Sequence, residues 1–343
     1  MKDELNWWVE NVDTQVRTIH KPSPDLTIST DSSMIGWGCI VAEGQESFNG
    51  HWSKDEQEEH INVLEVKAIL LAIKALIKHS TLKPNHIRVL SDSTTAVAYV
   101  NKMGGITSAK CNDIAKQIWT FCVDRNIWIS CQHIPGDINP ADAPSRKLHH
   151  DLEWQIEQQV FKKICKKLGQ PSIDLFASRT NYKISHYCSW IKDPDEAFID
   201  AFSLNWGNLR LPYLFPPFSL VGRCLQKINQ EKAEAIMIVA LWAQQLWFPF
   251  LMRSVVDQPI LLPDTSEILH LAHSNQKHPL SPKLKLIACR ISGDSTKSKI
   301  FRMTQSLLLQ RLGEHQRKHS ATPTSLSGFS FAVDGRSIQL VPL

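Results

Sequence analysis

The sequence predicts an α/β protein: a mixed five-stranded sheet with flanking helices, followed by a second, smaller α/β domain. Two apolar, β-branched runs end in the acids Asp31 and Asp92, and a long amphipathic helical pattern separates them. The alternation of strand and helix patterns then resumes after residue 150. With 343 residues, of which 43% are hydrophobic, the chain has room for two cores.

The first domain is expected over residues 25–150, after a lead-in segment at residues 1–24 that ends in a proline-rich stretch. Its expected elements are strands at about 25–31, 36–42 and 46–52, a long helix after Asn62, a strand at 87–91, helices at 94–101 and 108–125, and a strand at 127–133. A turn marked by Pro135, Gly136 and Asn139 then leads to Asp142.

The rest of the chain is expected to form a different unit. A second α/β domain is predicted over residues 151–270, with buried strands at 173–176 and 235–241. Lys, Ser, Thr, Gln and His accumulate after residue 275, so residues 271–343 are expected to be a linker and a truncated helical segment, with a helix inside 293–327.

Composition bounds the compartment and the class. No apolar run is long enough for a membrane span, and the first residues do not form a signal peptide. The eight cysteines lack a CxxC pair or zinc-like spacing, so they are expected mostly in the cores of a reduced, intracellular protein. Whether that protein is cytoplasmic or nuclear is not distinguished.

Charge is distributed unevenly between the two halves. Residues 1–150 hold 15 Lys and Arg against 18 Asp and Glu, a net charge of −3, whereas residues 151–343 hold 23 against 16, a net charge of +7. The acidic half suits a metal site, and the basic half could help to hold phosphates. Dispersed lysines are, however, most often a solvated surface.

Four acids carry the expected chemistry: Asp31 and Asp92 at strand ends, Glu65 on the long helix and Asp142 after the turn. Two strand acids, one helix acid and one loop acid can meet at one end of a sheet. Buried acids need a balancing cation, and carboxylate oxygens are the ligands that Mg²⁺ prefers. Two Mg²⁺ ions would suit phosphodiester cleavage, with Asp31 bridging them and Mn²⁺ as a substitute.

Each acid also has a plain structural interpretation. Glu65 stands three residues after Asn62, so it could be the acidic member of a capping box. Asp92 with Ser93 could cap the following helix, and Asp142 alone could be a loop acid. The four acids together, each in a suitable context, favour the metal site.

His133 and Asn139 lie in the run before Asp142. His133 could shuttle a proton near the site, because imidazole titrates near neutral pH. It could equally be a strand-end histidine bonded to backbone. Asn139 is expected to shape the turn, although it could face the substrate.

Four blocks of the chain resemble the ribonuclease H domain of retroelement reverse transcriptases, and among these the DIRS-type retrotransposons. The blocks are Thr30–Ser33 with Gly36–Gly38, Glu59–Glu65, Ser91–Ser93 and His133–Arg146, and the resemblance covers about residues 25–148. By this resemblance Asp31, Glu65, Asp92 and Asp142 match the metal-binding acids of the family. Ser32 and Pro144 depart from the usual pattern, but neither is a metal ligand.

The resemblance implies cleavage of the RNA strand of RNA–DNA hybrids during retrotransposon replication. It also implies an upstream reverse transcriptase domain as partner. Only about twenty residues precede the first matching block. No lysine-rich segment that could grip a hybrid lies between Asp92 and Ile127. The predicted substrate-binding residues, taken from the matching blocks, are Ser33, Asn62, Ser93 and Asn139. The alternative is a catalytically silent, truncated element copy that only binds nucleic acid.

The second half resembles the region that follows ribonuclease H in DIRS-type elements, and faintly resembles phage-type adenine-N6 methyltransferases. The residues concerned are Asp174–Ser178 with Asn181, Asp200–Phe202, and Phe215–Phe218. Such enzymes hold the target base with a polar residue before Pro-Pro-aromatic, a position that Phe215 takes here. A degenerate structural or DNA-handling module is therefore expected, and Leu286–Gly293 resembles the linker toward a recombinase.

Overall fold

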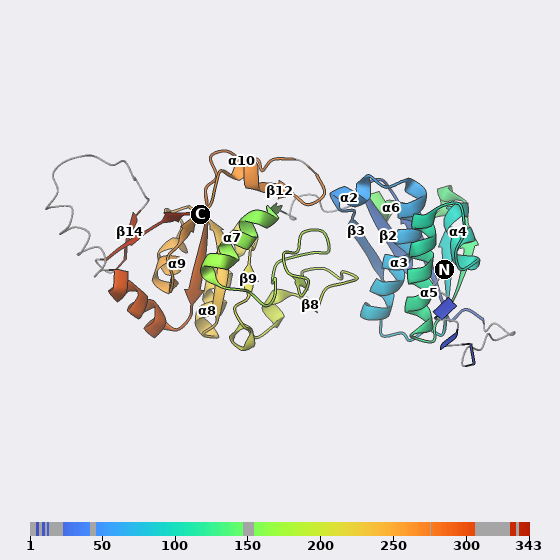
Figure 1. The fold of residues 1–343 in the computed structure, drawn as a ribbon, viewed down its shortest axis with the longest axis horizontal. Helices are drawn as coiled ribbons and strands as arrows, with labels where there is room; N and C mark the ends of the chain where they lie inside the picture. The colour runs from blue at the N-terminus through green and yellow to red at the C-terminus, as the bar shows by residue number, and fades with distance from the viewer. Residues whose placement is uncertain are drawn as a thin grey trace.

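The structure is a computed structural model that describes residues 5–6, 9–10, 12–13, 23–41, 46–146, 154–274, 276–305, 330–333 and 336–343. Two lobes are visible in Figure 1, each built on a five-stranded sheet. The lead-in segment expected at residues 1–24 lies almost wholly outside the described residues. Within them, no helix has both the length and the apolar character that crossing a membrane requires.

The first sheet is mixed and has the strand order β3-β2-β1-β4-β5. Its strands are β1 (Leu26–Ser32), β2 (Gly36–Val41), β3 (Ser47–His51), β4 (His86–Ser91) and β5 (Trp128–His133). β2 runs antiparallel to both neighbours, whereas β1, β4 and β5 are mutually parallel. The predicted five-stranded mixed sheet is confirmed, with each strand within a few residues of its expected position.

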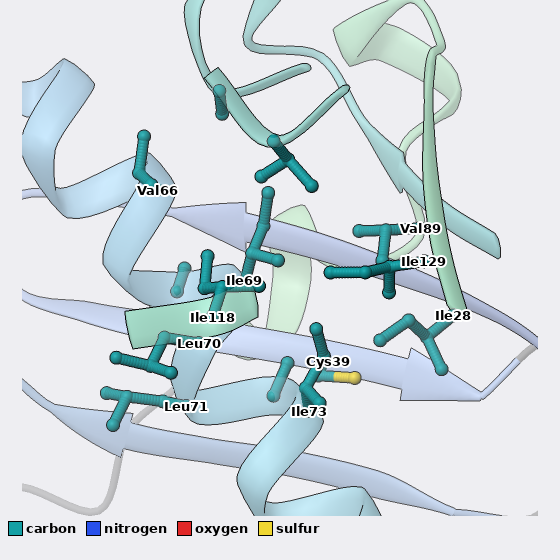
Figure 2. Close-up of a cluster of buried hydrophobic side chains, with 14 of the residues drawn as sticks. Ile28, Cys39, Val66, Ile69, Leu70, Leu71, Ile73, Val89, Ile118 and Ile129 are labelled. Carbon is teal, nitrogen blue, oxygen red and sulfur yellow. The ribbon is translucent and has the colours of Figure 1, made fainter. Parts of the chain in front are cut away.

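Three helices, α3 (Ile61–His79), α4 (Thr94–Asn101) and α5 (Ala109–Val123), belong to this sheet. Figure 2 shows their core, in which strand side chains such as Ile28 and Val89 meet Ile69 and Ile73 of α3 and Ile118 of α5. These side chains are almost fully buried. Burial of each one stabilises the fold by about 1.5–3 kcal/mol, so this layer holds α3 against the sheet.

Two short helices near this sheet position polar groups. The unpredicted α2 (Lys54–Gln57) begins with a capping box, in which Ser53 accepts from the Glu56 amide and the Glu56 carboxylate accepts from the Ser53 amide. The turn η1 (Gly136–Ile138) and α6 (Asp142–Arg146) follow β5. They carry the run that contains Asn139 and Asp142.

The second sheet has the order β16-β11-β13-β10-β9 and is covered on both faces. Its strands are β9 (Tyr213–Leu214), β10 (Glu234–Ala240), β11 (Ile260–Leu261), β13 (Leu286–Ser292) and β16 (Val341–Pro342). Helix α7 (Gln158–Leu168) covers one face, and α8 (Val221–Gln230) and α9 (Phe248–Ser254) cover the other. Burial on both faces explains the continuous apolar runs of β10 and β13.

The expectation of a linker at residues 271–343 is wrong for the middle part of that range. Residues 286–292 form β13, which pairs antiparallel with β10 and β11 at the centre of the sheet. Its apolar run is thus a core strand, and the second unit extends beyond residue 270. Residues 295–305 are helical, and the rest of the helix expected inside 293–327 lies beyond the described residues.

The strand predicted at 235–241 is confirmed as β10, whereas residues 173–176 form only bridges from Asp174 to Tyr187 and Tyr213. All eight cysteines are free and buried, as expected. The remaining short elements are β6 (Trp154–Ile156), β7 (Cys188–Ser189), β8 (Phe198–Ile199), η2 (Ala201–Ser203), η3 (Trp206–Asn208), η4 (Phe218–Leu220), α10 (Thr265–Ile268), β12 (Leu269–Leu271), β14 (Ser330–Val333) and β15 (Arg336–Gln339).

The two lobes are joined by buried ion pairs. The Arg179 guanidinium, from the second lobe, donates to both carboxylate oxygens of Glu56 at 2.7 and 2.9 Å and to the carbonyl oxygen of His51 at 2.7 Å. Nearby, the buried Glu196 carboxylate lies 3.1 Å from His79 Nε2 at the end of α3. The second lobe therefore contacts both α2 and α3.

Candidate active site

Two central strands of the first sheet bring Asp31 and Asp92 together. β1 and β4 are adjacent and parallel, so their carboxyl ends lie at the same edge of the sheet. Asp31 is the sixth residue of β1, and Asp92 directly follows β4. The backbone alone therefore places both carboxylates at one edge.

Glu65 reaches the same edge from α3. His60 is the N-cap of this helix, and its side chain accepts a hydrogen bond from the Asn62 amide. Glu65 thus lies beyond the first turn, and the alternative that it closes a capping box with Asn62 is wrong. Its buried carboxylate instead accepts a hydrogen bond from the backbone of Ser32, next to Asp31.

Asp31, Glu65 and Asp92 form a cluster in which one carboxylate oxygen of each lies within 4.8 Å of the others. Asp31 and Glu65 are 4% and 8% exposed. Burial, with the charges of Asp31 and Asp92, raises the pKa of Glu65 to about 8. Burial also raises the pKa of Asp31, against the hydrogen bond that Ser145 donates. Asp31 and Glu65 thus lie in a site that penalises their negative charge.

This cluster fits a divalent cation. Glu65 Oε2 is buried and has no hydrogen-bond partner within the described part of the chain, although an ionised carboxylate oxygen is a strong acceptor. The donor set consists wholly of carboxylate oxygens, which suits Mg²⁺ or Mn²⁺ rather than a thiolate-preferring metal. The residues that would hold the ion are Asp31, Glu65 and Asp92.

Asp142 lies apart from this cluster. It begins α6, its side chain is 47% exposed, and its Oδ1 accepts from Arg146 Nε and Nη2, both at 2.8 Å. Its charge nevertheless acts on Asp31. The structure therefore assembles three of the four predicted acids and holds the fourth in an exposed ion pair at the rim.

Two predicted substrate-binding residues are structural here. Asn139 is 5% exposed, with its Nδ2 donating to the Thr30 carbonyl oxygen and its Oδ1 accepting from the Ala141 amide. Of the two roles considered for Asn139, shaping the turn and facing the substrate, these contacts support the first. The hydroxyl of Ser33 closes the β1–β2 turn through Gly36 and donates to the Ser145 carbonyl oxygen at 2.8 Å.

Asn62 and Ser93 differ in their surroundings. The hydroxyl of Ser93 caps α4 by accepting from the Ala96 amide, while Asp92 beside it takes no part in that cap. Asn62 instead borders a groove of about 460 Å³. Its other polar lining residues are His60, Thr94, Thr95, Thr107 and Ser108. Of the two residues, Asn62 has the position suited to a ligand.

His133 ends β5, where its backbone pairs with Ser91 of β4, and it is exposed. Gly136 follows closely, and a Cβ atom there would come within 2.9 Å of Asp92 Oδ2. The loop after β5 thus packs against the Asp92 carboxylate. The role of His133 as a proton carrier stays a prediction.

Sequence reasoning did not select Ser145. Its hydroxyl donates to Asp31 Oδ2 at 2.6 Å, from a position 114 residues away in the chain. The residue lies inside the matching block that ends at Arg146, but no local pattern signals a contact over that separation. The only available signal was its place in that block.

The second lobe contains an aromatic cavity of about 280 Å³. Its lining includes Phe176, Phe202 and Phe215 together with Asp200 and Arg223. The segments that carry the faint methyltransferase resemblance thus converge on one cavity. Phe215 stands in it where that resemblance requires a polar residue, and the methyltransferase hypothesis stays a prediction.

The sheet order and the helices α3–α5 give residues 26–146 a ribonuclease H-like fold. No protein-family model matches the chain, and no curated protein matches it. Among solved structures, the chain is similar to LC11-RNase H1 in complex with an RNA/DNA hybrid, at 18% identity and a TM-score of 0.30, over 35% of this chain and 93% of that one.

Two further structures are similar. RNase H1 from Halobacterium salinarum NRC-1 is 15% identical, with a TM-score of 0.29 over 35% of this chain and 92% of that one. The prototype foamy virus protease–reverse transcriptase is 19% identical, with a TM-score of 0.24 over 45% of this chain and 22% of that one. The strand order β3-β2-β1-β4-β5 of the first sheet, and not these similarities, defines its fold.

Proposed function

We propose that this chain is a divalent-metal-dependent endonuclease that cleaves the RNA strand of RNA–DNA hybrids in retrotransposon reverse transcription. The observation that carries the proposal is the cluster of Asp31, Glu65 and Asp92, three carboxylates within 4.8 Å of one another. Among the residues that the structure describes, no basic side chain contributes to the charges that act on Glu65. An external cation is therefore the natural partner of the cluster.

The roles of the residues follow from their positions. The charges of both Asp92 and Asp142 act on Asp31, so Asp142 could join a second ion there after release from Arg146. A bound pair of Mg²⁺ ions would supply an activated water and neutralise charge on the leaving oxygen. His133, exposed beside the site, would exchange protons with solvent.

The groove beside Asn62 would hold the nucleic acid. Asn62 precedes Glu65 by one helical turn, and Thr94 follows Asp92 by two residues, so the groove borders the acids. Its hydroxyl and amide groups can donate to phosphate or sugar oxygens without adding charge. An upstream reverse transcriptase domain would supply the hybrid and additional affinity.

The test is cleavage of an end-labelled RNA–DNA hybrid by the full chain at low salt, with Mg²⁺, with Mn²⁺ and with EDTA. We expect metal-dependent cuts confined to the RNA strand. The Asp31→Asn, Asp92→Asn double variant should lose at least about 100-fold in rate. Asp124→Asn, which changes an exposed acid at the end of α5, is the matched control and should cleave normally. The proposal is falsified if the double variant cleaves as fast as the parent.

A catalytically silent chain that only binds nucleic acid is the rival. The Asp142–Arg146 ion pair favours it, because that pair keeps the fourth acid out of the cluster. Hybrid binding by the parent without cleavage in either metal would support the rival. The same experiment therefore separates the two functions.

A further inference from the structure

Ser145 is a fully buried residue of α6 whose hydroxyl lies 2.6 Å from Asp31 Oδ2. We propose that Ser145 is a positioning residue that fixes the Asp31 carboxylate for a divalent ion. This inference rests on the metal site of the proposed function. It adds to that function a group that does not touch the metal or the substrate.

The contact has the geometry of a charge-assisted hydrogen bond. An O–H donor to a carboxylate at this separation forms a bond about twice as strong as one between neutral groups. The same hydroxyl lies 2.9 Å from the Asp142 carbonyl oxygen, but its single proton serves one acceptor at a time. The shorter contact and the negative charge favour Asp31.

Ser145 is itself held from several sides. Its carbonyl oxygen accepts from the hydroxyl of Ser33, and its amide donates to the Ala141 carbonyl oxygen at 3.1 Å. On the strand beside Asp31, a Cβ atom at Gly38 would come within 2.6 Å of the Ser145 nitrogen. Only glycine at that position lets α6 approach β2 so closely. The hydroxyl therefore has little freedom to move away from Asp31.

The arrangement offsets a repulsion inside the site. The negative charges of Asp92 and Asp142 act on the Asp31 carboxylate and disfavour its ionised form. The hydrogen bond from Ser145 to Oδ2 fixes the orientation of the whole carboxylate within the cluster that it forms with Glu65 and Asp92. Groups that orient a metal ligand in this way typically change metal affinity by 10- to 100-fold when they are removed.

The experiment compares Ser145→Ala with Ser29→Ala in the full chain. Ser29 is a buried serine on the same strand as Asp31, so its variant controls for the loss of a buried hydroxyl. Isothermal titration calorimetry with Mg²⁺ and with Mn²⁺ gives the affinity, and thermal unfolding in EDTA gives the stability without metal. We expect Ser145→Ala to bind Mg²⁺ about 10-fold more weakly than the parent, and Ser29→Ala to bind it equally well.

A purely structural serine would give a different result: a lower melting temperature in EDTA with unchanged metal affinity. That result would overturn the inference and leave the proposed function intact. Failure of the parent to bind either metal would remove both. If Ser145→Ala binds metal more weakly than the parent and the parent does not cleave the hybrid, the inference stands and the nuclease function is rejected. If the alanine variant does not fold, Ser145→Cys, with a weak donor of similar size, should show a smaller loss of affinity, and no loss would overturn the inference.

Discussion

Glu56 and Glu65 are buried glutamates of the same lobe, 9% and 8% exposed, with opposite surroundings. Burial alone would raise the pKa of Glu56, but the hydrogen bonds and charge of Arg179, with a contact from Lys67, lower it to about 2. Glu65 has the same burial and two acidic neighbours, and its pKa rises to about 8. Among the described residues, Glu56 thus has cationic neighbours and Glu65 has none.

This difference separates an acid in a structural ion pair from the acid that we propose to be functional. The Glu56–Arg179 pair satisfies its own charges and joins the two lobes. Burial and the charges of Asp31 and Asp92 disfavour the ionised form of Glu65, a cost that a bound cation would offset. The pKa contrast is therefore a physical reason to place the metal at Glu65 and not at Glu56.

The largest expected effect comes from replacing each glutamate, Glu56 and Glu65, by glutamine in a separate variant. Glu56→Gln should lower the free energy of unfolding by about 3–5 kcal/mol, because it leaves the Arg179 guanidinium buried without its ionic partner. Glu65→Gln should leave the stability in EDTA unchanged or higher at pH 8, because it removes a repelled charge, and it should abolish cleavage. Urea unfolding in EDTA, with the hybrid assay alongside, measures both.

An equal loss of stability in the two variants would contradict the comparison, since it would mean that Glu65 has a cationic partner in the apo protein. Arg179→Ala is the reciprocal control and should resemble Glu56→Gln. Its effect should also be larger than that of Lys67→Ala, because the Lys67 side chain is 30% exposed.

The second prediction concerns pH. The folded pKa of Glu65, about 8, lies above its ordinary value of 4.5, so the folded state binds the extra proton between these values. Its contribution favours folding at low pH and is lost as pH rises from about 4.5 to 8. For Glu56, with a folded pKa of about 2, the contribution is present above pH 4.5 and is lost as pH falls toward 2.

The measurement is the difference in unfolding free energy between the parent and each Gln variant, from pH 3 to 9 in EDTA. For Glu65 the amplitude should be on the order of 3 kcal/mol, since proton sharing with Asp31 reduces the full effect. Addition of Mg²⁺ should flatten this curve at neutral pH, because a bound cation favours the ionised carboxylate. Parallel pH curves for the Glu56 and Glu65 variants would contradict the opposite pH dependences predicted for the two glutamates.

Sequence patterns were sufficient for the local parts of this arrangement. Apolar periodicity predicted the strands that end at Asp31 and Asp92 and the helix that carries Glu65. The cap of that helix was placed at Asn62 and is His60, because an imidazole nitrogen can accept where an amide oxygen was expected. Acids at two strand ends, on a helix and in a loop predicted a cluster of four acids at one end of the sheet, and the structure brings together three of them, Asp31, Glu65 and Asp92.

Contacts between distant segments could not be predicted in this way. Arg179 meets Glu56 across 123 residues, and neither residue has a local pattern that signals its partner. The run at residues 286–292 was interpreted as a linker from its resemblance and from the polar composition around it, and its pairing strand β10 lies about fifty residues earlier. Tertiary pairing, and not local propensity, decided both.

The smallest expected effect tests the rim of the site. The Asp142–Arg146 pair joins side chains that are 47% and 64% exposed, so solvent screens it and its loss should leave the free energy of unfolding almost unchanged. Arg146→Ala should therefore keep the melting temperature almost unchanged while freeing the Asp142 carboxylate. If Asp142 completes the metal site, the variant should reach half-maximal cleavage at a lower Mg²⁺ concentration, and Arg146→Lys should lie between. An unchanged Mg²⁺ dependence would place Asp142 outside the site and leave the buried three acids as the metal ligands.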